Sequence, residues 1–156
     1  MTAKMTKAPQ ILLLDWAQAK ERARAVREAV FVVEQNVPIE LEWDEWDSRC
    51  EHALALDEKG APIGTARLLP DGHLGRMAVL ASCRGAGIGR ALAQALLQRA
   101  VERGMPRIVL HAQIHAAGFY RKLGFSEFGE PFDEAGIPHI AMCCDLTPMA
   151  RDLTLP

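Results

Sequence analysis

The stretch from Arg84 to Leu92, with the sequence RGAGIGRAL, constrains the fold of this chain more than any other. Gly85, Gly87 and Gly89 fall within five positions, and a helical pattern of apolar residues follows them. Glycine at this density indicates that a ligand, a packing partner or the chain itself comes close to the backbone. Unpaired N–H groups and the helix dipole also make a helix start a suitable anion site.

Two familiar phosphate-binding loops do not fit this stretch. The dinucleotide fingerprint G-x-G-x-x-G differs from the G-x-G-x-G found here, and no strand with a terminal acidic residue follows at the required distance. An ATP-binding P-loop would require Gly-Lys followed by Ser or Thr, which the sequence does not have here. By spacing alone, an anion site and a tight turn between strand and helix both remain open.

The elements predicted around the loop indicate a mixed α/β layer with a partly antiparallel sheet. Before the loop, the pattern predicts a strand at 11–14, a helix at 16–33 capped by Asp15, a strand at 52–56, and a hairpin of strands 63–69 and 73–80. After the loop, it predicts a helix to about Arg103, a strand at 107–112, a short helix at 116–123, and strands at 125–128 and 139–146.

Length and composition fit an ordinary globular protein. A chain of 156 residues suits one domain, so we expect residues 1–156 to form one. The formal net charge of -2 argues against nucleic-acid or anionic-membrane partners. No apolar run is long enough for a membrane span and no signal-peptide pattern is present, so a cytoplasmic location is expected. The four cysteines have no zinc-like spacing, so no metal is expected.

One segment is unusually acidic. Residues 40–47 read ELEWDEWD, with two tryptophans among the carboxylates, and are expected to form a loop or a short helix. The simplest interpretation is a solvated acidic surface. An alternative is that the segment attracts a cationic amine.

Two motifs resemble those of the GCN5-related N-acetyltransferase (GNAT) superfamily. Residues 84–89, RGAGIG, match its R/Q-x-x-G-x-G/A loop, and residues 117–125, AGFYRKLGF, match its segment around F-Y-x-K-x-G-F. Residues 77–80 stand where the family has a bulged strand. The flanks, residues 30–38 and 129–139, resemble the ElaA-like subgroup. The resemblance spans most of residues 27–146.

The resemblance implies a fold and an activity. The fold would be a central mixed, mostly antiparallel sheet flanked by helices and splayed at the strand before the glycine loop. The activity would be transfer of an acetyl group from acetyl-CoA to a primary amine of a small molecule or peptide, by direct attack in a ternary complex. Alternatives are a non-catalytic CoA-binding sensor and an acyltransferase using another acyl-CoA. The protein would be a monomer or a homodimer.

The resemblance also implies a cofactor site. Backbone N–H groups of the loop would bind the pyrophosphate, the strand before it would pair with pantetheine, and one N–H of that strand would polarise the thioester carbonyl. The expected cofactor-binding residues are Met77, Ala78, Val79, Arg84, Gly85, Ala86, Gly87, Ile88, Gly89, Arg90, His115, Phe119 and Tyr120.

Several side chains have more specific expectations. Tyr120, the single tyrosine, matches the family's general acid for the leaving thiolate. His115 stands near the position of a family asparagine that bonds the pantetheine arm, and Phe119 is expected chiefly to pack. His73, on the strand before the loop, is a tentative general base, with a solvated turn histidine as the alternative. His111, at the end of the next predicted strand, is another candidate for the base, but it could equally lie in the hydrophobic core. Glu34, Glu134 and His139 lie in the subgroup segments and would shape the acceptor pocket.

Overall fold

The computed structural model describes residues 8–147, which form a seven-stranded sheet. Its order is β1-β2-β3-β4-β5-β7-β6, and every neighbouring pair is antiparallel except β4 and β5. The strands are β1 (Gln10–Leu14), β2 (Glu51–Leu56), β3 (Pro62–Leu68), β4 (His73–Val79), β5 (Arg107–Gln113), β6 (Ser126–Glu134) and β7 (Ile137–Asp145). The expected mixed, mostly antiparallel α/β fold is therefore confirmed.

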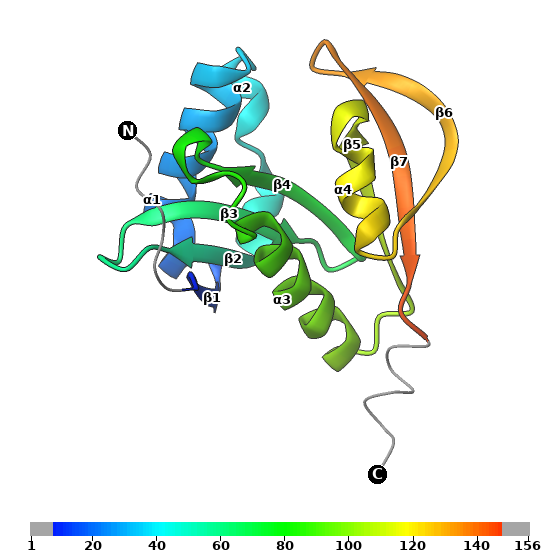
Figure 1. The fold of residues 1–156 in the computed structure, drawn as a ribbon, viewed down its shortest axis with the longest axis horizontal. Coiled ribbons are helices and arrows are strands. Elements are labelled where there is room, and N and C mark those ends of the chain that lie inside the picture. Colours follow the sequence, from blue (N-terminus) through cyan, green and yellow to red (C-terminus); the bar gives the residue numbers. More distant parts are fainter. Residues whose placement is uncertain (1–7, 148–156) are drawn as a thin grey trace.

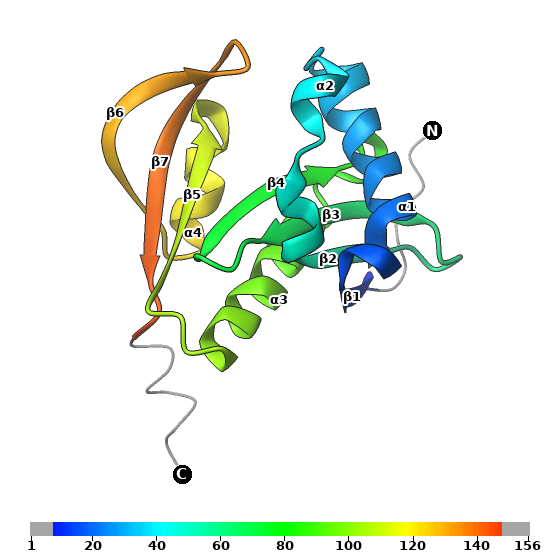
Figure 2. The same ribbon diagram turned by 180° about the vertical axis from the view of Figure 1, so that it is seen from behind.

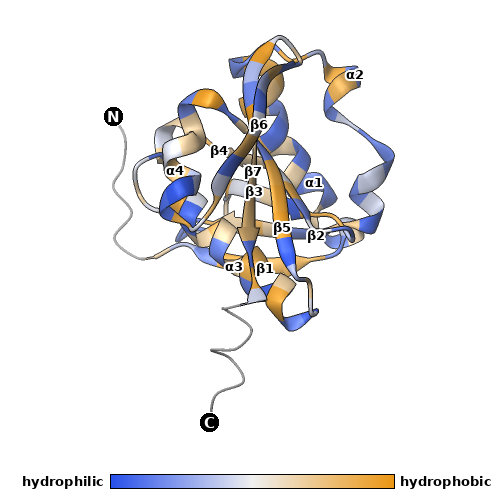
Figure 3. Cartoon of the chain, turned by 90° about the vertical axis from the view of Figure 1, so that its right-hand side faces the viewer, coloured by the Kyte–Doolittle hydropathy of each residue, from blue (hydrophilic) through white to orange (hydrophobic). Residues whose placement is uncertain are grey.

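The sheet has two parts, β1–β4 and β5–β7, and different helices cover each part. In the β1–β4 part, α3 (Ile88–Glu102) packs on one face and α1 (Trp16–Arg27) on the other (Figures 1 and 2). The β5–β7 part has α4 (Ala117–Lys122) beside it, and α2 (Ile39–Glu42) lies at the far end of α1. Hydrophobic residues concentrate on the central strands, and much of the helix and loop surface is hydrophilic (Figure 3).

The first helix begins as predicted and changes form near its end. Asp15 caps it, because its Oδ1 accepts from the N–H of Gln18 at 2.9 Å. The α-helix stops at Arg27, and the chain continues as a π-helix over Glu28–Glu34. The N–H of Gln35 donates to the carbonyl of Val30 at 3.0 Å, five residues back. Such wider turns occur frequently at functional sites.

A close approach fixes α3 on the sheet. A Cβ added at Gly64 of β3 would lie 3.0 Å from side-chain atoms of both Ile88 and Leu92, so only glycine lets the helix pack this closely. The helix ends at Glu102, and Gly104, two residues later, has the left-handed φ of +73° that is typical of the residue after a helix cap.

The acidic segment is only partly the solvated surface expected from its composition, since Glu40 and Glu45 are exposed but two other carboxylates are buried. Glu42 and Asp47 are only 3% and 2% exposed, and both pair with Arg27, which is 1% exposed. Arg67, on β3, pairs with Asp44 and Asp47 at 2.7 and 2.9 Å. Burial of these carboxylates is possible because each is paired with an arginine. The arginines lie 15 to 23 positions away, so the composition of the segment does not indicate the pairing.

The closing hairpin is longer than the predicted strand at 125–128. β6 runs on to Glu134 and turns through Ala135 and Gly136, which have φ values of 52° and 78°. Two successive left-handed residues are typical of a type I′ hairpin turn. A register shift between Phe128 and Phe132 interrupts the pairing of β6 with β7. The hairpin therefore extends past the C-terminal end of β5, where Gln113 pairs with His139 of β7.

Candidate active site

The parallel strands β4 and β5 separate after a short contact. They pair only at His73 with Val109 and at Leu74 with Leu110. The register of β4 against β3 then shifts, and Arg76 takes a left-handed conformation with φ of 47°. An extra residue of this kind is a β-bulge, which bends its strand. The expected splay at the strand before the glycine loop is therefore present.

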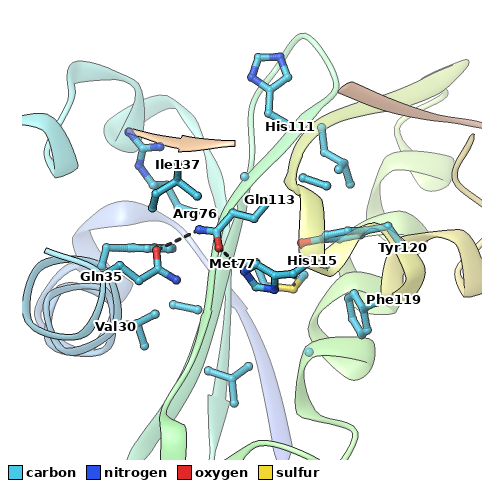
Figure 4. Close-up of a pocket in the computed structure, with 18 of the residues that line it drawn as sticks. Val30, Gln35, Arg76, Met77, His111, Gln113, His115, Phe119, Tyr120 and Ile137 are labelled. Carbon is cyan, nitrogen blue, oxygen red and sulfur yellow. Dashed lines mark hydrogen bonds between the residues drawn. The ribbon is translucent and has the colours of Figure 1, made fainter. Parts of the chain in front are cut away.

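A cavity of about 990 Å³ lies in this split. Its walls come from the π-helix, β4, the glycine loop and the start of α3 on one side, and from β5, α4 and the β6–β7 hairpin on the other (Figure 4). Of the expected site residues, twelve line it: Met77, Ala78, Val79, Arg84, Gly85, Gly87, Ile88, Gly89, Arg90, His115, Phe119 and Tyr120. Ala86 and His73 do not.

The glycine loop presents backbone to the cavity. Gly85 and Gly87 have φ values of 86° and 80°, which side chains rarely adopt, and an added Cβ at either would have nothing within 4 Å. The first hydrogen bond of α3 joins the N–H of Ala91 to the carbonyl of Gly87 at 3.0 Å. The preceding N–H groups, of residues 88–90, therefore have no partner within the helix. Because open space and unpaired N–H groups meet here, the loop is suited to bind an anion and is more than a tight turn between strand and helix.

Arg84 joins the loop to the π-helix. Its guanidinium donates to both carboxylate oxygens of Glu34 at 2.7 Å, and its Nε donates to the carbonyl of Val79 at 3.0 Å. The hydrogen bond from Arg84 holds the pKa of Glu34 below its usual value. Arg84 therefore reaches the cavity with its charge already paired, and an anion bound at the loop would share it with Glu34.

Peptide groups of β4 also face the split. The N–H of Leu80 donates to the carbonyl of Ile63 on β3 at 2.9 Å. Because successive peptide groups alternate in direction along a strand, those of Val79 point away from β3. This orientation directs the Val79 N–H toward the cavity, where a carbonyl oxygen could accept from it.

Tyr120 lies at the inner wall of the cavity. Its hydroxyl is 3.6 Å from the thioether sulfur of Met77, which is a weak acceptor. The rings of Phe119 and Phe125 stand edge-on to it at 5.0 and 5.9 Å. Burial raises the pKa of Tyr120 to about 12, so the hydroxyl keeps its proton at neutral pH. A cavity-facing hydroxyl of this kind is suited to donate a hydrogen bond or a proton.

A chain of amides crosses the split. Gln113, at the end of β5, donates to the side-chain oxygen of Gln35 at 2.9 Å, and its own oxygen lies 2.7 Å from Nε2 of His115 (Figure 4). His115 thus lines the cavity and has a protein partner. Nothing in the local sequence marks Gln35 or Gln113, which lie 78 positions apart and meet only in the folded chain.

The histidines considered as site residues differ in whether they line the cavity. His73 is paired with Asp71 at 3.0 Å, outside the cavity, so the position of its ring does not favour the predicted base role. His111, on the next strand, lines the cavity together with Glu134 and His139. Alternation along β5 could have placed His111 opposite the buried residues Leu110 and Ala112. No local pattern predicts that the β6–β7 hairpin places Glu134 and His139 beside His111.

Comparison with known proteins identifies the class. Residues 18–146 match the family described as Acetyltransferase (GNAT) domain, and the chain belongs to this family. The uncharacterized N-acetyltransferase YjcF of Bacillus subtilis is 43% identical over 124 residues, which cover 77% of this chain and 88% of that protein.

The ElaA-like subgroup is also supported. Protein ElaA of Escherichia coli is 32% identical over 125 residues, covering 75% of this chain and 81% of ElaA. The crystal structure of ElaA superposes with a TM-score of 0.79 over 88% of this chain and 100% of that one, at 28% identity. An acyl-CoA N-acyltransferase from Pseudomonas aeruginosa gives 0.78 over 88% and 99%, at 29% identity. The protein is an N-acetyltransferase. Within residues 8–147, no helix is long and apolar enough to cross a membrane.

Proposed function

We propose that this enzyme transfers the acetyl group of acetyl-CoA to a primary amine of a small molecule or peptide, by direct attack while both substrates are bound. The observation that carries the proposal is that one cavity joins the open glycine loop, the bulged strand β4 and the hydroxyl of Tyr120. These are the parts that must bind a thioester, polarise its carbonyl and protonate its sulfur. The same proposal treats residues 1–156 as one domain.

The residues at the loop fit a CoA pyrophosphate. The free N–H groups of residues 88–90 and the start of a 15-residue helix favour a doubly charged anion. Space beside Gly85 and Gly87 lets the phosphates reach these groups. Arg84 and Arg90 would add positive charge, and His115 and Phe119 would contact the pantetheine arm.

Each chemical role falls to a group of this chain. The Val79 N–H would donate to the thioester oxygen and stabilise the negative charge that develops there during attack. Tyr120, protonated at neutral pH because burial raises its pKa to about 12, would donate its proton to the departing sulfur. With both substrates in one cavity, the amine can reach the acetyl carbon without a covalent enzyme intermediate.

The test is calorimetric titration of acetyl-CoA into a Gly87→Glu variant. The new carboxylate would occupy the anion site, so affinity should fall by about 100-fold or more, roughly 2.7 kcal/mol. Gly104→Glu is the matched control, because Gly104 has a similar φ of +73° with nothing near an added Cβ, at the opposite end of the same helix. Equal binding by both variants would refute the loop assignment. Tight binding without turnover of any amine would instead favour a CoA sensor.

A further inference from the structure

The side chains of β5 alternate between the two faces of the sheet, and residues of both faces reach the cavity. Leu110 and Ala112 of β5 belong to the hydrophobic core against which Tyr120 packs. His111 and Gln113 alternate with them and project to the other side. Figure 4 shows both residues at the cavity, on the same strand. A histidine at this position, 43% exposed, is accessible to a bound substrate.

His111 belongs to a cluster that joins three strands. Nδ1 of His111 lies 3.1 Å from Oε1 of Glu134 on β6, and Nε2 of His139 on β7 lies 3.5 Å from Oε2 of the same carboxylate. Nδ1 of His139 is bonded to the carbonyl of Ile137 at 2.6 Å, and the ring of Phe132 packs beside both histidines, 5.0 and 6.0 Å away. The carboxylate therefore has a hydrogen bond to His111, whereas His139 gives its Nδ1 hydrogen to the Ile137 carbonyl.

The hydrogen bonds determine where His111 can accept a proton. A carboxylate only accepts, so Nδ1 of His111 carries the hydrogen that points to Glu134. In the neutral ring Nε2 then has a free lone pair. A carboxylate behind Nδ1 also stabilises the cation formed when Nε2 is protonated, as in the general-base pairs of hydrolases.

Glu134 differs from the other carboxylates that line the cavity. Glu34 is paired with Arg84 at 2.7 Å and Glu42 with Arg27 at 2.6 Å, so a permanent cation neutralises each. Within residues 8–147, the recorded ion-pair partners of Glu134 are His111 and His139, which can be neutral. Its charge therefore remains available to a positively charged substrate or to a protonated His111.

We propose that His111 is the general base for the acceptor amine and that Glu134 orients it and attracts the ammonium form. The inference rests on the proposed function and assigns the acceptor side of that same site. It replaces His73, which stands edge-on to His111 at 6.2 Å but is paired with Asp71 outside the cavity. The acceptor is accordingly an amine that arrives as a cation.

The proton balance is complete without another reactant. Nε2 of His111 removes one proton from the ammonium group and becomes imidazolium, which leaves the neutral amine. The amine nitrogen forms a bond to the acetyl carbon, and the bond from that carbon to sulfur breaks. Tyr120 gives its proton to the sulfur and regains one from the nitrogen as the amide forms. His111 later releases its proton to water, so the products are the amide, free CoA thiol and one proton.

The test is the pH dependence of kcat/KM for His111→Gln and Glu134→Gln. The amine is whichever of 2-phenylethylamine, 1,4-diaminobutane or a lysine-containing peptide the unaltered enzyme acetylates fastest. The groups that face His111 are His73 on β4, Glu134 on β6 and His139 on β7, with Asp71 behind His73. His111→Gln should lower kcat/KM at neutral pH by roughly 100-fold or more and abolish the acidic limb of the profile.

Glu134→Gln gives a second signature. Without the carboxylate, Nδ1 of His111 loses the acceptor that fixes the orientation and tautomer of the ring, so kcat/KM should fall by about tenfold across the pH profile. Glu130→Gln is the matched control, because it makes the same change on the same strand outside the cavity and should leave the profile unaltered. Calorimetry should give unchanged acetyl-CoA affinity for all three variants, which would show that the donor site is intact.

The contrary outcomes are distinct. An active enzyme in which His111→Gln keeps both its rate and its acidic limb would overturn this inference and leave the proposed function standing. If His73→Gln lost the acidic limb of the pH profile and His111→Gln kept it, the general base would be His73. That result would also overturn this inference and leave the proposed function standing. Failure of the unaltered enzyme to acetylate any of the amines, despite binding acetyl-CoA, would overturn the proposed function and this inference with it.

Discussion

The surroundings of Tyr120 decide the chemistry of its hydroxyl. In water the phenol would be an unremarkable weak acid, but burial beside Phe119 and Phe125 raises its pKa to about 12. Its recorded hydrogen-bond acceptor is the Met77 thioether at 3.6 Å, a weak partner that a thiolate sulfur would outcompete. The residue is thus held protonated, facing the cavity in which a leaving sulfur would form.

Tyr120→Phe should lower kcat by about 100-fold to 10,000-fold, the usual contribution of a positioned acid. Acetyl-CoA affinity and the unfolding midpoint should change little, because the ring and its packing remain. Release of CoA thiol gives the rate, and calorimetry gives the affinity. A variant with undiminished kcat would show that water or another group protonates the sulfur.

Among the elements, the segment that contains α2 has the strongest polar attachment to the rest of the fold. Arg27 of α1 lies between Glu42 and Asp47 at 2.6 and 2.8 Å, and Trp43 packs over its guanidinium at 5.2 Å. Arg76 of the β4 bulge reaches Glu42 at 3.6 Å. The network therefore connects α1 and the acidic segment to the bulge that forms one wall of the cavity.

Arg27→Met should destabilise the protein by about 3–5 kcal/mol, because it removes the cation that lies between two buried carboxylates, Glu42 and Asp47. Urea denaturation followed by circular dichroism measures the loss. Arg103→Met is the control: the Arg103 side chain is 55% exposed, so loss of its ion pair with Glu51 should cost about 1 kcal/mol or less. Similar losses in the two variants would mean that the buried network contributes no more than a surface pair.

For the whole molecule, stability in acid should depend on the same network. Partial burial of Asp44 opposes its ionisation, but hydrogen bonds and charge from Arg67, helped by Arg76, outweigh this and lower its pKa below the ordinary 3.8. A lowered pKa in the folded state means that the unfolded chain takes up the proton first as pH falls. The stabilisation from Asp44 is therefore complete above that ordinary value and is lost as pH falls through the folded-state pKa.

Asp44→Asn should accordingly be less stable than the unaltered protein by an amount that is constant between about pH 5 and 7 and shrinks toward pH 3. Urea denaturation at a series of pH values measures the difference. A gap that stays constant down to pH 3 would show that the Arg67 pair does not stabilise the ionised carboxylate.

Much of the fold is encoded locally. The Asp15 cap, the Gly104 stop and the strand order around the hairpin follow from hydrogen bonds and steric limits that act within a few residues. The prediction was less complete where distant residues decide. The acidic segment was expected to be solvated because its arginine partners, Arg27 and Arg67, lie 15 to 23 positions away from the carboxylates that they bind.

By itself, the sequence determined the glycine loop and the helix that follows it, because backbone freedom and helix polarity are local properties. The donor site expected there rested on the family resemblance of this loop and of the segment around Tyr120. Only the tertiary structure brings together the residues that we propose for the acceptor side. His111 and Glu134 lie 23 positions apart, and Gln35 and Gln113 78 apart, and each pair meets across separate elements. Contacts of this kind depend on how the sheet and the helices pack, which no short sequence pattern encodes.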